Sequence, residues 1–243
     1  MVFKTKSGAL RLIQFILIII FNYQFCNSQI YEVGLLVGKS YFIGDVGETK
    51  FINILTPKIQ EDYLYGLTLK WNRSPRHSYR FSFISGELAA NDLASKDPRR
   101  LGRGYKFSTP LREISLGMEF NFFDYNLHEY DVIFTPYLYS GLIYSKYNKQ
   151  LLQNGVITDM SKKNSTFGIP IVIGMKYRFF DNFILSFEIG ARYTFTDDID
   201  ASNVSEENFN YNFGNINNND WYMFSIMNLS YTFGRQPCYC NIK

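Results

Sequence analysis

The sequence predicts an all-β fold, an eight-stranded antiparallel transmembrane β-barrel with up-and-down topology. Three observations support this prediction. Eight segments, each of about ten residues, alternate apolar with small or polar side chains, which is the two-residue period of a strand. Aromatic residues gather at the ends of the apolar stripes, and the connections alternate between short and long. Both features are typical of barrels that cross a membrane.

The N-terminus has the pattern of a cleaved export signal. Three basic residues precede an apolar run over 12–21, and the small residues Cys26 and Ser28 stand before a cut at Gln29. The run is too short to span a bilayer stably. A lipid anchor on Cys26 is the alternative, although the side chains before it are bulky. We expect a signal peptide over 1–28, a barrel over 29–234 and a periplasmic tail over 235–243.

The first four segments each have one clearly apolar face, with Gly, Ser, Thr and charged residues opposite. The apolar positions are Tyr31, Val33, Leu35 and Val37; then Tyr63, Tyr65, Leu67, Leu69 and Trp71; then Tyr79, Phe81 and Phe83; then Ile114, Leu116, Met118, Phe120 and Phe122.

The fifth segment, near 132–144, is assigned on spacing, because Pro136 and several tyrosines blur its alternation. The last three segments alternate clearly. Their apolar positions are Phe167, Ile169, Ile171, Ile173, Met175, Tyr177 and Phe179; then Leu185, Phe187, Ile189, Ala191, Tyr193 and Phe195; then Met223, Met227, Leu229, Tyr231 and Phe233.

The connections favour a membrane barrel over a soluble β-sandwich, in which the apolar faces would pack inward. Short turns are expected near 72–78, 123–131 and 180–183, and long loops near 44–61, 88–110, 145–166 and 196–219. Short periplasmic turns and long outward loops are typical of bacterial outer-membrane barrels. The expected location is therefore the cell outer membrane.

The polar faces predict a filled interior. An eight-stranded barrel is only wide enough for its own side chains, and its inward charges nearly cancel. We therefore expect a packed lumen of paired charges, and a conducting pore is the weaker interpretation. The inward charged residues are Glu32, Glu113, Glu119, Glu188, Lys70, Arg80, Lys176, Arg178 and Arg192.

Composition and motifs argue against several classes of function. The 25 basic residues fall to 22 without residues 1–28, and these balance 22 acids, so nucleic-acid binding is not expected. We expect no enzyme activity, because His77 and His128 fall in predicted periplasmic turns, away from the outer mouth. The run Asp197, Asp198, Asp200 lacks the spacing of an EF-hand calcium loop. No cofactor or metal is expected.

Two predicted outer loops have opposite charge. One is basic, with candidate residues Arg99, Arg100 and Arg103, and the other is acidic, with Asp197, Asp198 and Asp200. The charges suggest that the loops fold over each other, or that they bind lipopolysaccharide or a protein.

The tail holds Cys238 and Cys240, the cysteines that remain after cleavage at residue 28. Export permits disulfides. With one residue between them, the two cysteines either form a strained disulfide with each other or remain as thiols that pair with another chain. A third interpretation is that they have no role. A zinc site is disfavoured, because two thiolates supply half of the ligands.

Several stretches resemble a Bacteroidetes outer-membrane family, the PorG-like barrels, whose fold is OmpA-like. The resemblance covers about 30–240 and rests on structural rather than catalytic motifs. The similar stretches are 41–47 (YFIGDVG), 70–79 (KWNRSPRHSY), 97–100 (DPRR), 118–124 (MEFNFFD), 134–141 (FTPYLYSG), 187–200 (FEIGARYTFTDDID), 217–221 (NNNDW), 231–234 (YTFG) and 237–240 (PCYC).

The resemblance implies a non-enzymatic component of the type IX secretion system. It implies a barrel that anchors a periplasmic ring of PorK-like and PorN-like proteins beneath the outer membrane. The candidate contacts are then Arg73, Arg76 and His77 in a short turn, with Cys238 and Cys240 in the tail. A general surface barrel whose long loops bind lipopolysaccharide or external ligands, and a narrow pore, are the alternatives.

Overall fold

The computed structural model describes the wall of the protein and parts of its loops. The described residues are 30–47, 63–127, 134–153, 156–200, 203–206, 209–212 and 219–234. The predicted signal peptide, His128 and the tail with Cys238 and Cys240 lie outside these ranges.

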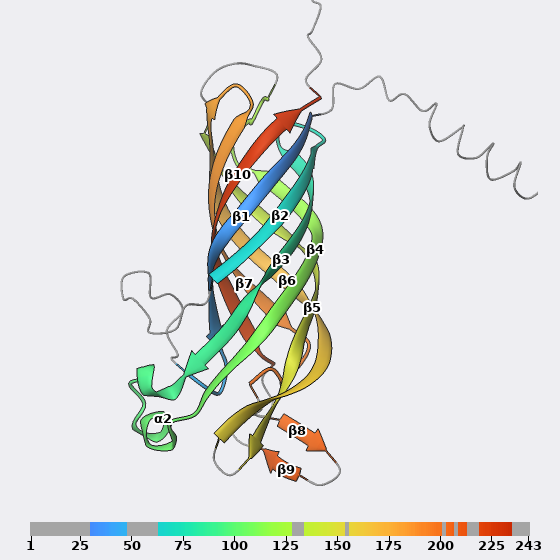
Figure 1. The fold of residues 1–243 in the computed structure, drawn as a ribbon. Helices are drawn as coiled ribbons and strands as arrows, with labels where there is room; N and C mark the ends of the chain where they lie inside the picture. Colours follow the sequence, from blue (N-terminus) through green and yellow to red (C-terminus); the bar gives the residue numbers. More distant parts are fainter. Residues whose placement is uncertain are drawn as a thin grey trace, which may run out of the picture.

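Eight strands close into an antiparallel barrel, in the order β1-β10-β7-β6-β5-β4-β3-β2, as Figure 1 shows. Sequential strands are neighbours and β1 pairs with β10, so the predicted up-and-down topology is confirmed. The barrel strands are β1 (Ile30–Ile43), β2 (Tyr63–Asn72), β3 (His77–Asn91), β4 (Lys106–Asn121), β5 (Phe134–Gln153), β6 (Val156–Phe180), β7 (Phe183–Thr194) and β10 (Trp221–Phe233).

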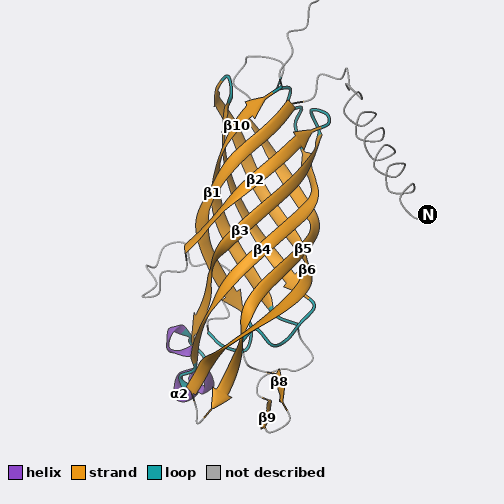
Figure 2. Ribbon diagram, turned by 45° about the vertical axis from the view of Figure 1, so that its right-hand side comes forward, coloured by secondary structure: helices purple, strands orange, loops and turns teal. Residues whose placement is uncertain are grey.

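The two ends of the barrel differ. The start of β1 and the end of β10 lie at one end, together with the turns at 73–76 and 181–182. We call this the short-turn end. The opposite long-loop end holds the 3₁₀ helix η1 (Asp92–Ala94), the helix α2 (Pro98–Arg103) and the hairpin of β8 (Asn203–Glu206) and β9 (Phe209–Asn212), as Figure 2 shows.

The strands on the long-loop side are longer than the sequence predicted. The prediction of long loops over 88–110 and 145–166 is wrong in part, because β3 and β4 pair out to Asn91 and Lys106. Likewise β5 and β6 pair out to Gln153 and Val156. These extensions pair within their own hairpins and leave the membrane region, so their side chains do not show the apolar stripe that marks the spans.

The outer wall is apolar over its whole circumference. Register pairs join Leu229 to Leu35, Leu35 to Leu67, and Leu67 to Phe83, and all four side chains are exposed. So large an apolar surface is expected to face lipid rather than water. A closed sheet is also the β-structure that a bilayer core accepts, because it has no unpaired edge. The protein is an outer-membrane β-barrel.

Candidate functional site: the lumen and both ends of the barrel

The lumen contains the predicted charged side chains, and all nine are at most 3% exposed. Arg80 on β3 crosses the barrel to Glu188 on β7, with two nitrogen–oxygen distances of 2.6 and 2.8 Å. Tyr137 donates to the same carboxylate over 2.8 Å. A bidentate arginine pair with a further donor is the geometry that buried charge requires. This part of the lumen is therefore a fixed contact between opposite walls.

Gly174 makes room for Tyr137. A Cβ added at Gly174 would overlap the Tyr137 ring. The ring therefore lies directly against the backbone of β6. The small residues on inward positions of this strand are therefore space for large side chains from β5, rather than the lining of a channel.

Glu119 on β4 contacts cationic side chains from three other strands. Its carboxylate pairs with Lys176 of β6, lies 3.1 Å from the Lys70 amine of β2, and lies 3.8 Å from an Arg80 nitrogen of β3. Lys70 also lies 3.8 Å from Glu32 on β1. The expected pairing of lumen charges is confirmed for this group.

A third polar group lies nearer the long-loop end. Tyr222 on β10 donates to Glu113 over 2.7 Å and bonds Ser145 over 2.6 Å. The Arg192 side chain lies 3.6 Å from Glu113 and stacks 4.0 Å from the centroid of the Phe224 ring. Polar and apolar groups are thus interleaved along the interior.

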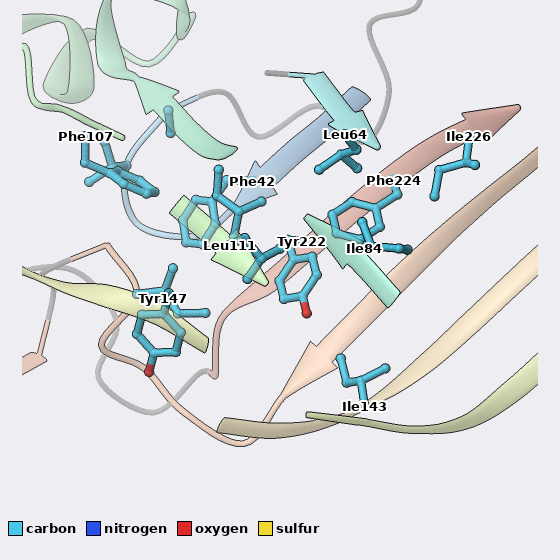
Figure 3. Close-up of a cluster of buried hydrophobic side chains, with 14 of the residues drawn as sticks. Phe42, Leu64, Ile84, Phe107, Leu111, Ile143, Tyr147, Tyr222, Phe224 and Ile226 are labelled. Carbon is cyan, nitrogen blue, oxygen red and sulfur yellow. The ribbon is translucent and has the colours of Figure 1, made fainter. Parts of the chain in front are cut away.

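Apolar clusters cover both ends of this charged interior. Toward the long-loop end, inward side chains pack together inside the barrel (Figure 3). At the short-turn end, Tyr125 and Leu127 of the β4–β5 connection pack with Ile30 and Ile184. The larger cluster includes Phe42, Leu64, Ile84, Phe107, Leu111, Tyr147, Phe224 and Ile226. Hydrated ions would have to cross both apolar layers.

At the short-turn end, Arg76 bonds the β2–β3 turn to the β4–β5 connection. Its side chain contacts Asp124 at 2.5 Å and donates to the Phe122 carbonyl over 2.6 Å. Its own carbonyl accepts the Asn121 N–H over 2.8 Å. The β2–β3 turn and the β4–β5 connection are therefore locked together.

The other predicted residues of this surface point outward. Arg73 and His77 are exposed. The Arg73 guanidinium lies 6.0 Å from the centroid of the Trp71 ring, and the His77 ring lies 5.3 Å from that of Phe120. The turn thus presents two cationic or titratable groups beside an aromatic rim.

The basic loop is organised by α2. Asp97 caps the helix by accepting the Arg99 N–H over 2.9 Å, and this hydrogen bond, with the Arg99 guanidinium, lowers the pKa of Asp97. Arg100 donates to the carbonyl of Gly47 over 2.7 Å and of Gly44 over 3.2 Å. Arg99, by contrast, is almost fully exposed.

Arg103 and Asp92 complete this attachment. Arg103 pairs with Asp92 at 2.6 Å and donates to the Asp45 carbonyl, while Gly47 N–H donates to Asp92 over 2.8 Å. Gly47 has a φ of 98°, a conformation that favours glycine. The turn at 44–47 is thus held from the β3–β4 side.

The acidic loop reaches the same turn from the β7 side. Asp200 accepts the N–H groups of Asp45 and Val46 over 2.9 and 3.3 Å. Asp198 accepts from Tyr147 and from Asn164. The expectation that the two loops fold over each other is therefore refined, because both are attached to a third segment at 44–47.

Asp220 lies beneath this loop and is 2% exposed. It accepts the Ile199 N–H over 3.0 Å. Burial, followed by the negative charge of Asp200, raises the pKa of Asp220 well above its usual value. Asp197 adds a further negative charge nearby.

Several residues of these sites were missed from the sequence. Asp92 and Asp220 are not among the residues that the sequence analysis singled out. Tyr125 and Leu127, which pack at the short-turn end, fall in a connection that was predicted to be a short turn. An apolar pair in a connection that was expected to be a short polar turn is the signal that could have revealed this packing.

In the described ranges, no helix is long and apolar enough to cross a membrane. In the same ranges, no group of three or more His, Cys, Asp or Glu side chains is arranged to hold a metal ion.

Solved outer-membrane proteins have similar folds at low identity. The N-terminal barrel domain of Pseudomonas aeruginosa OprF is 13% identical, with a TM-score of 0.43, over 83% of this chain and 97% of that one. Yersinia pestis Ail, the attachment invasion locus protein, is 9% identical, with a TM-score of 0.46, over 85% and 100%. Neisserial surface protein A is 11% identical, with a TM-score of 0.44, over 85% and 98%.

A comparison with curated proteins finds no relative of this sequence. One family profile matches nearly the whole chain, over residues 11–242, and its description is a domain of unknown function, DUF6089. The chain therefore belongs to the DUF6089 family.

Proposed function

We propose that this barrel is a non-enzymatic anchor of a protein secretion machine, one of the type IX kind, to which the PorG-like resemblance points. In this role the short-turn end binds a periplasmic ring of PorK-like and PorN-like proteins. The lipid bilayer holds the barrel, and the barrel holds the ring.

The observation that supports an anchor best is the filled interior. The lumen charges are paired between strands that are not neighbours in the sheet, and apolar clusters lie at both ends. A barrel that transports nothing must act through its surfaces. A barrel whose strands are joined by ion pairs through the lumen also resists deformation when a partner pulls on it, as an anchor must.

The periplasmic surface has the features of a binding site. Arg76 fixes the β2–β3 turn against the β4–β5 connection, so Arg73 and His77 are displayed on a pre-organised support. Pre-organised surfaces lose less conformational entropy on binding. The acidic or aromatic groups of a ring subunit would complement this turn.

The test is a mild-detergent pull-down from outer membranes with Arg73→Glu, run beside wild type. We expect wild type to recover ring proteins and Arg73→Glu to recover on the order of tenfold less, because charge reversal at an interface repels its partner. Arg99→Glu is the matched control at the opposite end, and its recovery should equal that of wild type. Wild-type barrel recovered alone would contradict the proposal.

The predicted role of the tail is tested in the same experiment. Non-reducing gels of wild type and Cys238→Ser/Cys240→Ser distinguish the readings of the C-x-C pair. A higher band that is lost in the variant supports a covalent link to a partner. An unchanged monomer band in both proteins counts against that link.

The long-loop end favours a second candidate, a surface barrel that binds lipopolysaccharide or external ligands. Here α2 and the acidic loop are both attached to the 44–47 turn, which gives a fixed outer platform. Loop truncations that alter adhesion and leave secretion intact would support this candidate. A narrow pore is the third, and single-channel steps in a planar bilayer would support it.

A further inference from the structure

The outer face of β3–β6 changes from apolar to polar at one register row. These strands lie side by side in Figure 2. The last apolar row toward the long-loop end is made of Phe83, Ile114, Tyr144 and Phe167, which are paired in that order. The next outward row is Ser85, Arg112, Lys146 and Ser165, also paired in order.

The second row lies where lipid headgroups begin. Successive residues on one face of a strand are about 7 Å apart along it. The two cations therefore stand directly beyond the apolar surface, at the depth that basic anchors occupy in membrane proteins. Each is flanked by a serine on the neighbouring strand, so the row presents only hydrogen-bond donors and hydroxyl groups.

Arg112 and Lys146 face each other without a carboxylate between them. They are direct cross-strand partners on β4 and β5, and both are exposed. In the part of the chain that the structure describes, no salt bridge involves either residue. Like charges directly opposite destabilise a sheet, so an anion that bridges them would stabilise this row.

The neighbouring groups do not supply that anion. Lys146 lies 5.6 Å from the centroid of the Tyr144 ring, which is part of the apolar row. The next outward residue on β3, Glu87, lies one position farther from the membrane and accepts a hydrogen bond from Ser108.

The opposite side of the barrel is different. There the outward positions of β7 and β10 are uncharged over their whole length, and the rim is aromatic. The Tyr193 ring lies 4.9 Å from Trp221 and 5.7 Å from Phe195, centroid to centroid. The cation pair is therefore a local site and not one part of a uniform basic girdle.

We propose that Ser85, Arg112, Lys146 and Ser165 form a binding site for the phosphate of a phosphorylated glycolipid in the outer leaflet. The occupant is a lipid because the row continues the lipid-facing surface, so acyl chains can cover Ile114 and Tyr144 while the phosphate bridges the cations. The site lies on the wall of the barrel, far from the short-turn end. It does not depend on the proposed role in secretion.

The test measures retention of lipid by the purified barrel in detergent. Native mass spectrometry follows a titration with diphosphoryl lipid A and, separately, with the dephosphorylated lipid. We expect wild type to retain the phosphorylated lipid selectively. Arg112→Gln/Lys146→Gln should bind it on the order of thirtyfold more weakly, at about fivefold for each basic residue near an anionic lipid surface.

Two further variants keep the result interpretable. Lys96→Gln/Lys106→Gln removes the same charge from exposed positions of the basic loop outside α2 and should bind like wild type. Arg112→Lys/Lys146→Arg keeps both charges and should also retain the lipid. Heat-modifiability on gels verifies that each variant is folded.

The proposal is overturned if the glutamine double variant binds like wild type, or if the loop variant loses as much affinity. Equal retention of the dephosphorylated lipid would also overturn it. Competition by millimolar inorganic phosphate alone would assign the cations to a free anion and contradict the lipid assignment.

Discussion

At the scale of single residues, buried charge has opposite consequences inside the barrel and at its outer mouth. In the lumen each carboxylate has a cation within reach, as Glu188 has Arg80. At the long-loop end, Asp220 is buried among Asp197, Asp198 and Asp200. Its carboxyl is therefore favoured in the protonated form, since a buried carboxylate beside other carboxylates is costly.

Asp220→Asn should raise the thermal stability of the barrel near neutral pH. The folded pKa of Asp220 lies above its unfolded value. Its favourable contribution is therefore complete below the unfolded pKa and is lost as the pH rises through the folded pKa. The amide removes that loss and can still accept the Ile199 N–H. Melting measured by heat-modifiability at about pH 3 and about pH 8 should show a gain only at the higher pH.

Asp97→Asn is the control, because the pKa of Asp97 is shifted in the opposite direction from that of Asp220. The pKa of Asp97 is lowered by Arg99, so its contribution is present above the unfolded pKa and is lost as the pH falls through the folded value. Its substitution should therefore give no gain at the higher pH. A gain for Asp220→Asn that is as large in acid as near neutrality would contradict the assignment.

At the scale of elements, the long-loop end is held together by side chains that reach one turn from two directions. The η1–α2 segment reaches 44–47 through Arg100 and Arg103, and the loop after β7 reaches it through Asp200. α2 has only six residues, too few for independent stability. Its position therefore depends on these contacts.

Arg103→Ala should release the η1–α2 segment from the turn at 44–47. The change removes the ion pair to Asp92 and leaves that buried carboxylate with fewer donors. Hydrogen bonds to charged groups contribute roughly 1.5–3 kcal/mol, so hydrogen exchange in 92–105 should accelerate on the order of tenfold or more. Arg99→Ala on the same helix should leave exchange unchanged. Equal protection in both variants would contradict this account.

At the scale of the whole molecule, the interior network ties together strands that are not paired neighbours in the sheet. Arg80 of β3 pairs with Glu188 of β7 on the opposite wall. Glu119 of β4 contacts Lys70 of β2 and Lys176 of β6. Strand pairing alone connects only neighbours around the circumference. These crossings therefore add a constraint that the sheet itself does not supply.

Glu119→Gln should lower the free energy of unfolding by about 3–5 kcal/mol, because it leaves buried cations without their shared carboxylate. Urea titration in detergent, followed by the gel shift of the folded barrel, measures this change. Glu87→Gln is the matched control on the exposed face of β3 and should stay within about 0.5 kcal/mol of wild type. Similar effects of the two substitutions would show that the lumen network contributes little.

The strand pattern was predictable because lipid imposes it on every membrane span. Each outward stripe, such as 31–37 or 167–179, must be apolar wherever it faces acyl chains, and alternation then follows from strand geometry. The inward charges, from Glu32 to Arg192, followed from the same alternation. The outer extensions of β3–β6 escaped prediction because their outward positions, such as Glu87, Lys106 and Lys163, are polar and exposed. The apolar stripe of the spans is therefore absent there, although inward residues such as Leu88 and Phe107 are buried.

The sequence by itself determined the barrel, its strand number, the location in the outer membrane and which charges face inward. These depend mainly on a local period that seven of the eight segments display within about ten residues, while the fifth was assigned on spacing. Only the tertiary structure decided that Tyr125 and Leu127 close the short-turn end, that 44–47 joins the two charged loops, and that Arg112 meets Lys146. Those contacts join residues far apart in the chain, and their register depends on how eight strands close around one axis.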